Sequence, residues 1–498
     1  MRRSFDIHAL TSPQQLVSLA VMACFLFAAV VSGVVVASGN LMLIAMTAGL
    51  VIGLVLLSAV PAVVWLVLFG TLIVTGPLLL FHPQLNRVPW LFSLLGFFLL
   101  GASILYAGTD RRMDRPQLPA FIWIAIIYMP FTLLMLAFSD GSLGVEMTAI
   151  KRQFQFWGLM FALAIVPINK QTIYRWVTFL LFIALLQLPM ALYQYVVLVP
   201  MRLNLPNRVV PIDIVAGTFE ADMMGGGNSN VMAYFLIVCL VGVLAMWRDK
   251  VVNLPIGVGL LALIMLPLGL GETKLALVML PVALLAVYGD LVRKRPVVFA
   301  MGSVVALIGL LALTYVYVSV QAVDDRPMTF EQRLDENLQY NFGEAGYYSG
   351  ASLNRATVVP YWWNQHGASN PVETMFGHGL GASFSAPGTE AEGHLALRYP
   401  GFAIGLTGIS ALLWDVGLVG TLMYIAILVL AWFATAKLIA RADPGRDRAL
   451  LRTLLASIST LMVFLLAGEQ MLSAPSMEVL MAITLGMVAW RWRQKEAR

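Results

Sequence analysis

Apolar stretches about 20 residues long recur along most of the chain, and this feature limits the fold more than any other. A stretch of that length crosses a bilayer as a helix, because each backbone polar group must find its hydrogen bond within the membrane. The 498 residues are 60% hydrophobic and only 11% charged, which leaves too few polar groups to cover a water-soluble globule. The sequence therefore predicts an all-α polytopic membrane protein.

The expected transmembrane helices number about 14. They lie near residues 16–37, 41–60, 61–81, 88–107, 118–138, 153–168, 172–198, 229–247, 252–270, 274–290, 297–320, 416–438, 453–471 and 476–490. Two connections are longer than usual, a loop at 199–228 and a large loop at 321–415. The chain then divides into residues 1–320 with eleven helices, the large loop, and residues 416–498 with three helices and a tail.

Most lysines and arginines lie on one side of these helices. If the N-terminus is cytoplasmic, 21 of the 31 lysines and arginines lie on the cytoplasmic side, as the positive-inside rule requires. Both termini are then cytoplasmic, and the loops at 199–228 and 321–415 face outward. The first apolar run lacks a small-residue cleavage pattern, so we expect it to remain as a membrane helix. The net charge is +5, and the cytoplasmic lysines and arginines face anionic lipid headgroups. No nucleic-acid partner is therefore predicted.

The loop at 321–415 reads as an ordered segment. It contains the aromatic run VVPYWWNQH and the glycine-rich run FGHGLGASF, which supply buried surface and tight turns. Its first part, residues 321–345, is rich in acidic residues, and we expect a solvated amphipathic helix there.

A short charged turn, GETK, joins the expected helices at 252–270 and 274–290 on the outer side. One interpretation is an ordinary capped hairpin, in which Thr273 caps the returning helix and Lys274 extends to lipid headgroups. The other is that Lys274, held on a rigid turn, binds an anion at the bilayer surface. Glu272 lies beside it in either case.

Five segments follow one another in a recognisable order. They are AGTFEADMMGGGNSNVMAYF (216–235), GETKLALVMLP (271–281), LNRATVVPYWW (353–363), FGHGLGASF (376–384) and SALLWDVGLVGTLMY (410–424). This order resembles the bacterial O-antigen polymerase and O-antigen ligase family, over roughly residues 215–430. The resemblance implies a GT-C-like helical bundle in the bacterial inner membrane, with its activity at the periplasmic face.

The resemblance also implies a reaction. Family members use a polyprenyl-diphosphate-linked glycan as donor and a second glycan as acceptor, with a flippase and a chain-length regulator as expected partners. We expect a polymerase that builds exopolysaccharide or O-antigen. A ligase that moves glycan to a lipid or protein acceptor is the close alternative. A lipid-linked oligosaccharide flippase is the alternative from the transporter class, although charges here gather at the outer face rather than along a path through the helices.

Fixed cations are expected to bind the donor diphosphate. Acidic residues and histidines on the outer side have no convincing metal-ligand spacing, so we predict neither a metal nor another cofactor. Lys274 stands where the family often has arginine, which keeps the charge but not the bidentate fork. Arg355 matches the arginine before the aromatic segment of the large loop. Arg202 and Arg208, in the other outer loop, are candidates for contacts to diphosphate or sugar.

The acceptor hydroxyl needs a general base. The family commonly has a histidine and an asparagine about nine residues before the acid of the last motif, where this chain has Leu406 and Thr407. The candidates for the base are His394, Glu220, Asp222 and Glu272.

Two further side chains are candidates for binding the substrate. Arg398 would lie one helical turn after His394, and Trp362 could stack on a sugar ring. Asp415 and Glu469 are interpreted as structural acids, the first at a helix start and the second with a partner inside the bundle.

Overall fold

The computed structural model describes most of the chain from residue 59 onward. The described residues are 59–109, 117–136, 139, 141–203, 205, 210–224, 227–271, 273–297, 353–386 and 392–496, with the isolated residues 33, 37, 300–302, 304, 332, 335 and 343. Most of each expected helix at 16–37, 41–60, 297–320 and 321–345 lies outside them. The chain divides into two units, residues 1–63 and 64–498, and helix packing is described within the second.

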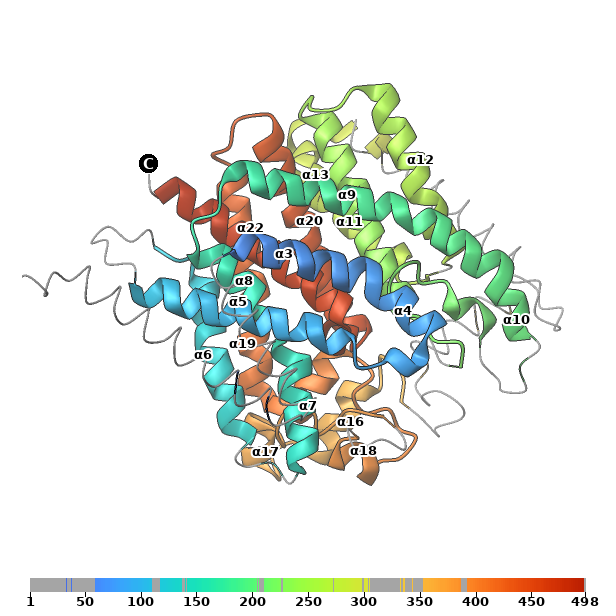
Figure 1. Ribbon diagram of the computed structural model, residues 1–498, viewed down its shortest axis with the longest axis vertical. Helices are drawn as coiled ribbons and strands as arrows, with labels where there is room; N and C mark the ends of the chain where they lie inside the picture. Colours follow the sequence, from blue (N-terminus) through green and yellow to red (C-terminus); the bar gives the residue numbers. More distant parts are fainter. Residues whose placement is uncertain are drawn as a thin grey trace, which may run out of the picture. The chain divides into compact units, whose positions relative to one another are not determined.

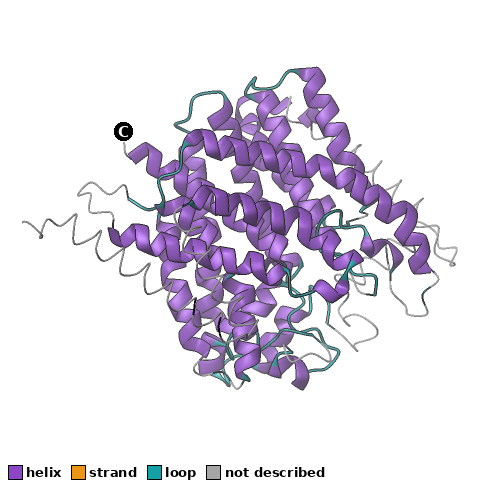
Figure 2. Cartoon of the chain, in the orientation of Figure 1, coloured by secondary structure: helices purple, strands orange, loops and turns teal. Residues whose placement is uncertain are grey.

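Helices are the only regular secondary structure among the described residues (Figures 1 and 2). The longer ones are α3 (Val60–Phe69), α5 (Pro89–Thr109), α6 (Ala120–Leu136), α7 (Leu143–Phe154), α8 (Trp157–Ile165), α9 (Lys170–Tyr193), α11 (Ser229–Arg248), α12 (Leu254–Leu270), α13 (Ala276–Lys294), α19 (Gly408–Ile439), α20 (Arg446–Ala467) and α22 (Pro475–Glu496). The shorter ones are α4 (Thr75–Phe81), α10 (Val199–Leu203), α16 (Val358–Gln365), α17 (Pro371–Phe376), α18 (His394–Arg398) and α21 (Gln470–Ser473). Single π-helical turns join α3 to α4 and α9 to α10.

Six helices in the described part are long and apolar enough to cross a membrane. They are Val60–Phe81, Pro83–Thr109, Lys170–Leu203, Ser229–Arg248, Gly408–Ile439 and Arg446–Ala467. Three shorter apolar helices accompany them, at Ala120–Leu136, Leu254–Leu270 and Ala276–Leu291. By helix length and hydropathy this is a multi-pass membrane protein, and each of these segments lies at a predicted span.

The predicted span at 153–168 is not a single helix. Helix α7 ends at Phe154, and α8 begins at Trp157 and has 9 residues. At 1.5 Å per residue α8 is about 13 Å long, which is less than half of the hydrocarbon thickness. The prediction failed because α8 is apolar on all sides, and composition cannot separate a short buried helix from part of a membrane span.

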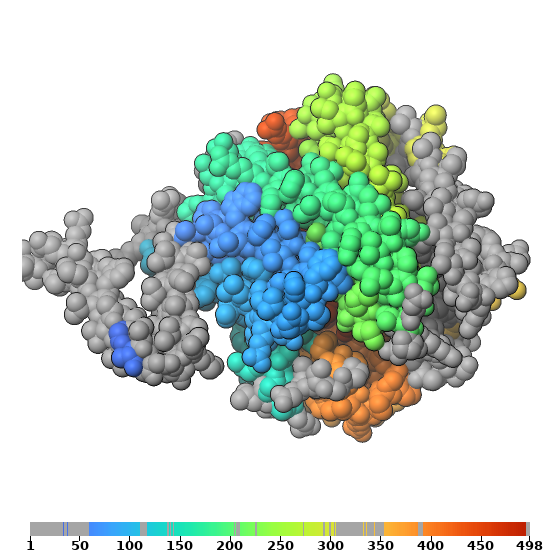
Figure 3. Space-filling model, turned by 45° about the vertical axis from the view of Figure 1, so that its right-hand side comes forward, coloured from blue at the N-terminus to red at the C-terminus, as the bar shows by residue number. Residues whose placement is uncertain are grey.

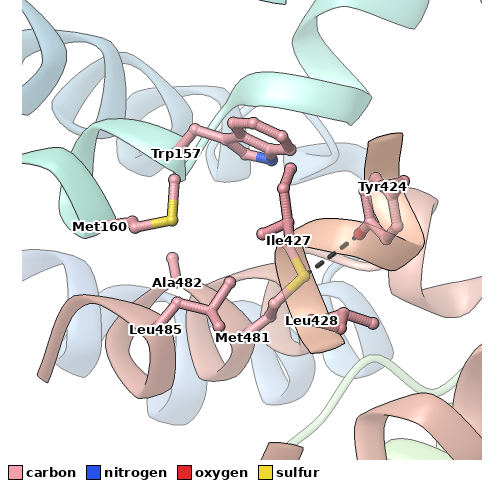
Figure 4. Close-up of a pocket in the computed structure, with 8 residues that line it drawn as sticks. All are labelled: Trp157, Met160, Tyr424, Ile427, Leu428, Met481, Ala482 and Leu485. Atoms are coloured by element: carbon pink, nitrogen blue, oxygen red, sulfur yellow. Dashed lines mark hydrogen bonds between the residues drawn. The ribbon is translucent and has the colours of Figure 1, made fainter. Parts of the chain in front are cut away.

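Helix α8 packs at the centre of this unit because it has no polar face. Its residues from Trp157 to Ala164 are all buried, with α5 on one side and α22 on another. Where α8, α19 and α22 meet, an apolar cavity of about 10 Å³ remains, lined by Trp157, Tyr424 and Met481 among others (Figure 4). The Tyr424 hydroxyl donates to the Met481 sulfur at 3.2 Å, so its polar group is bonded inside this core.

Two glycines allow α5 to approach the break between α7 and α8. A Cβ at Gly96 would lie 1.8 Å from the carbonyl oxygen of Gln155, and a Cβ at Gly158 would lie 2.0 Å from that of Gly96. The Gln155 side chain bonds across the break, since Ser93 donates to its oxygen at 2.7 Å and its amide donates to Glu478 at 2.8 Å. The broken backbone is therefore held by side chains from α5 and α22.

Helix α19 begins at Gly408, well before its expected start at 416. Thr407 caps it reciprocally with Ser410, and the helix bends at Gly417, whose φ is 64°. Asp415 therefore lies inside the helix just before the bend, and the expectation that it sits in the first turn is wrong. Thr273 likewise does not cap α13, whose N-cap is Leu275, but donates to the carbonyl oxygen of Ser229 at 3.3 Å.

The described part of the large loop packs on the start of α19. Helices α16 and α17 contact α19, and an apolar core joins the loop to the helix. The buried residues of this core are Trp362, Ala382, Leu395, Ile404, Leu413 and Trp414. The order predicted from aromatic and glycine content is thus confirmed for residues 353–386 and 392–407.

Charged groups gather at two ends of the helices. The loop end holds α16 to α18, the start of α22 and the end of α20, where Arg355 donates to the carbonyl oxygen of Ala467 at 2.7 Å. The basic end holds the connections at 249–253 and 440–445 and the last residues of α22. Figure 1 shows the loop end at the bottom and the basic end at the top, and Figure 3 shows helices α12 and α13 at the top and the orange atoms of the loop at the bottom.

Candidate functional site

The glycine-rich segment FGHGLGASF wraps around Asp415 at the loop end. The backbone N–H groups of Gly381 and Ser383 donate to the two carboxylate oxygens of Asp415, each at 2.8 Å. Gly377, Gly379 and Gly381 have φ values of 72°, 97° and 79°, a region that other residues rarely adopt. Glycine at every second position therefore lets this backbone turn its N–H groups toward one carboxylate. Two motifs that the sequence relates only by order meet here.

A small cavity beside Asp415 brings together two more ionisable side chains. Arg152, near the end of α7, and Glu469, between α20 and α21, line it together with Asp415. Its volume is about 20 Å³, room for about one water molecule. The Arg152 guanidinium lies over the ring of Phe384, with Cζ 3.2 Å from the ring centre. Burial lowers the pKa of Arg152, while the charges of Asp415 and Glu469 raise it.

Glu469 is the acid in this cavity that titrates near neutrality. Burial raises its pKa to about 7, the charge of Arg152 lowers it, and the charge of Asp415 raises it further. The side chain is only partly buried, so it can be reached from outside the cavity. A carboxyl group with these properties can accept and release a proton at physiological pH.

Arg355 is bonded to the last residue of α20, Ala467, which is two residues before Glu469. Its Nε–H group donates to the last carbonyl of the helix, that of Ala467, where a cation complements the helix dipole. The preceding Asn354 holds the local turn, since its side-chain oxygen accepts the N–H groups of Ala356 at 3.0 Å and Thr357 at 2.9 Å. The predicted loop arginine is thus bonded to Ala467, which precedes the acid that titrates near neutrality by two residues.

Lys274 and Arg202 belong to a second group of charges at the loop end. Arg202 is buried in α10, and Lys274 is exposed in the turn before α13. Both act on Asp213, which lies in a 3-10 turn at Pro211–Ile214. Burial raises the pKa of Asp213, and the charges of Arg202 and Lys274 lower it. Two of the predicted cations therefore share one carboxyl group.

Glu220 links this second group to the break between α7 and α8. Its carboxylate accepts hydrogen bonds from Asn228 at 2.8 Å and from the Ser476 hydroxyl at 2.6 Å. Ser476 lies in the first turn of α22, and two residues later Glu478 accepts from Gln155 in the break. Hydrogen-bonded side chains therefore connect the segment that carries the GTF motif to the end of α7.

The remaining predicted residues lie apart from the cavity or outside the described residues. Glu272 and Arg208 are outside them. Asp222 is exposed, and its side chain accepts the backbone N–H group two residues on at 2.9 Å. Arg398 is exposed at the end of α18, with its guanidinium 5.8 Å from the ring centre of Tyr399.

Histidines and tryptophans of the loop form their own cluster. His394 begins α18, and its ring centre is 6.4 Å from that of His378. His378 in turn contacts His366, with the two Nε2 atoms 2.8 Å apart. Trp362 stacks on His366 inside the loop core and is 2% exposed, so its indole offers no open face to a sugar. The neighbouring Trp363 is 53% exposed and is the tryptophan of the pair that a ligand can reach.

Sequence reasoning missed the three residues that define the cavity. It counts Arg152 only as one of the cations of the outer side, and it treats Asp415 and Glu469 as structural acids. Two signals point to them. Asp415 lies in the motif SALLWDVGL, which closely follows the glycine-rich segment, and Glu469 lies within the span predicted at 453–471, where an ionisable residue is a functional candidate by default.

Comparison with known proteins does not identify the chain: no family model matches the sequence, and a search of the curated proteins finds no match. In the part that the structure describes, no group of three or more histidine, cysteine, aspartate or glutamate residues is placed to hold a metal ion. The loop end instead offers several cations, a carboxylate held by backbone N–H groups, and a carboxyl group that titrates near neutrality.

Proposed function

We propose that the protein is a metal-independent glycosyltransferase that joins polyprenyl-diphosphate-linked repeat units into a longer glycan at the outer face of a bacterial inner membrane. The observation that carries this proposal is the meeting of Arg152, Asp415 and Glu469 in one cavity, between segments that resemble those of the O-antigen polymerase and ligase family. Lys274 and Arg355, the cations expected from that resemblance, are at the same end of the helices.

The proposed reaction forms one glycosidic bond and releases a lipid diphosphate. The acceptor hydroxyl oxygen bonds to the anomeric carbon of the donor, and the bond from that carbon to the diphosphate oxygen breaks. The electron pair leaves with the diphosphate, whose developing charge is stabilised by fixed cations. We assign this role to Lys274 and Arg355, whereas Arg202 is buried and acts on Asp213. The cavity is too small for a sugar, so the sugar rings are placed outside it.

Glu469 is the proposed acceptor of the hydroxyl proton. Its pKa of about 7 leaves a substantial fraction ionised at neutral pH, and its side chain is partly open to the surroundings. The competing acid Glu220 already accepts hydrogen bonds from Asn228 and Ser476. Asp415 accepts backbone N–H groups at both oxygens, which favours its role in fixing the glycine-rich loop.

Polymer output from defined substrates tests the proposal. Purified protein in lipid nanodiscs would receive lipid-linked repeat units, and chain length would be followed on gels for wild type, Lys274→Ala and Lys274→Arg. We expect Lys274→Ala to lower the rate about a hundredfold and to leave single units unreacted. Lys274→Arg should retain more activity because the charge is kept. Glu373→Gln, in α17 at the loop end, is the matched control and should behave as wild type.

The other outcomes assign the activity differently. Chain lengths unchanged in Lys274→Ala would leave Lys274 as part of a capped hairpin and would remove it from the reaction. Wild-type protein that moves the glycan to a non-glycan acceptor without lengthening it would be a ligase. Wild-type protein that neither lengthens nor transfers the glycan would refute glycosyl transfer.

A further inference from the structure

A second and larger cavity lies at the basic end, where α11 and α13 end and α20 begins. Its volume is about 420 Å³, within the range of small-ligand sites. Lysines and arginines dominate its lining. They are Arg248, Lys250, Lys294, Arg295, Arg448 and Arg452.

Only some of this positive charge is balanced. Asp249 pairs with Arg452 at 2.9 Å, and Asp290 pairs with Arg248 at 2.6 Å. For the other cations of the lining, the described residues hold no carboxylate within ion-pair distance. These are Lys250, Lys294, Arg295 and Arg448. The cavity therefore carries an excess of positive charge that an anion would balance.

Hydrogen-bond donors at the start of α20 add to this charge. The Nε–H group of Arg448 is buried and meets no acceptor among the described residues. Helix α20 is 22 residues long, and its N-cap, Gly445, makes no side-chain cap. The first residues of the helix, Arg446 and Asp447, line the neighbouring cavity, and Arg448 and Arg452 are the residues of α20 that line this one.

Lys250 occupies a position that favours glycine. It follows the end of α11 with φ of 59°, a conformation that strains a residue with a side chain. Glycine at this position would relieve the backbone strain, so the presence of lysine indicates that the Lys250 side chain has a role. Beside it in sequence, Trp247 and Leu254 are both exposed, as expected of side chains at a membrane interface.

We propose that this cavity binds the phosphate group of an anionic phospholipid from the leaflet at the basic end. The phosphate lies among Lys250, Lys294, Arg295 and Arg448, and the acyl chains follow the exposed apolar surface that begins at Trp247 and Leu254. That surface favours a lipid over a soluble phosphate as the source of the anion. The site is independent of the proposed glycosyl transfer, because it is at the opposite end of the helices.

Native mass spectrometry of delipidated protein tests this site. The protein would be incubated with phosphatidylglycerol or with phosphatidylcholine of the same acyl chains, and retained lipid would be counted as collision energy rises. We expect wild type to retain phosphatidylglycerol selectively. The double variant Lys250→Gly, Arg448→Gln should bind it about tenfold more weakly or worse, since each cation near a headgroup contributes to binding. The control Arg441→Gln, Arg446→Gln removes the same charge from the neighbouring cavity and should change binding less than about twofold.

Two further measurements keep the result from being ambiguous. Lys250→Gly alone should not lower the melting temperature, because glycine relieves the strain, so weaker lipid binding in that variant cannot be attributed to misfolding. Millimolar inorganic phosphate should not displace the lipid. Equal lipid retention in wild type and the double variant would overturn the proposal, as would equal loss in the control pair. Phosphate binding without selectivity for phosphatidylglycerol would identify a soluble anion and overturn the lipid assignment.

Discussion

The two ends of the helices treat ionisable groups in opposite ways. At the basic end, carboxylates pair directly with cations: Asp447 with Lys170 and Arg491, Asp290 with Arg248, and Asp249 with Arg452, at 2.6–3.0 Å. At the loop end, Asp415 is held by backbone N–H groups, and Glu469 shares a small cavity with Arg152.

This difference separates a structural use of charge from a chemical one. A carboxylate in direct contact with a cation joins two helices, because each partner is compensated and neither is available to a ligand. Carboxyl groups buried near a cation without such compensation keep a shifted pKa, as Glu469 does. We therefore expect mutations in these ion pairs of the basic end to change stability, and mutations of the acids at the loop end to change activity.

The largest effect is expected from Asp249→Ala at the basic end. Asp249 and Arg452 are each 5% exposed, so the variant leaves a buried arginine without its partner. We expect a loss of about 3–5 kcal/mol in the free energy of unfolding, measured by denaturation in detergent micelles. Lys170→Gln is the matched control: Lys170 is 48% exposed, and Asp447 keeps Arg491, so the loss should stay below about 1 kcal/mol. Equal losses would show that burial does not distinguish these ion pairs.

The next effect is expected from Asp415→Asn at the loop end. Asparagine keeps the shape of the side chain, but its amide group faces one of the two N–H donors of Gly381 and Ser383. We expect glycan transfer to slow about a hundredfold, equivalent to about 2.7 kcal/mol of activation free energy. Asp443→Asn removes an exposed acid at the basic end and should leave transfer unchanged. Full activity in Asp415→Asn would mean that the glycine-rich loop needs no carboxylate to hold it.

The sequence predicted most of the membrane helices because hydrophobic length is a direct consequence of bilayer thickness. It could not predict the break at Gln155, since that break depends on the close approach of Gly96 and on side chains from α5 and α22. Such contacts join residues far apart in the chain. The early start of α19 was missed for a similar reason, because Gly408 packs against the end of α20.

The candidate site was only partly accessible to sequence reasoning. Cations in outer loops stand out in an apolar chain, and Lys274 and Arg355 were found in this way. Arg152 and Glu469 were not, because their importance comes from sharing a cavity that four separate segments form. Trp362 was chosen over Trp363 without knowledge of the helix phase. In α16 the buried face runs through Val358 and Trp362, four residues apart, which leaves Trp363 outside.

The smallest effect, and the sharpest test of the loop end, is the pH dependence that Glu469 confers. Proton acceptance needs the ionised carboxylate, and with a pKa of about 7 the rate should rise about tenfold between about pH 6 and pH 8. Stability should move in the opposite direction. The folded pKa is above the ordinary value of 4.5, so the fold favours the protonated form, and this stabilisation is lost as pH rises through about 7.

Glu469→Gln separates this residue from other titrating groups. The variant should be slow at every pH, and wild type should lose thermal stability relative to it between about pH 5 and pH 8. If Glu469 is the proton acceptor, its ionisation causes both changes. Activity should then rise, and relative stability should fall, over the same pH range. A rate that still rises with pH in Glu469→Gln would assign the proton to another residue, and His394 would then be the first alternative.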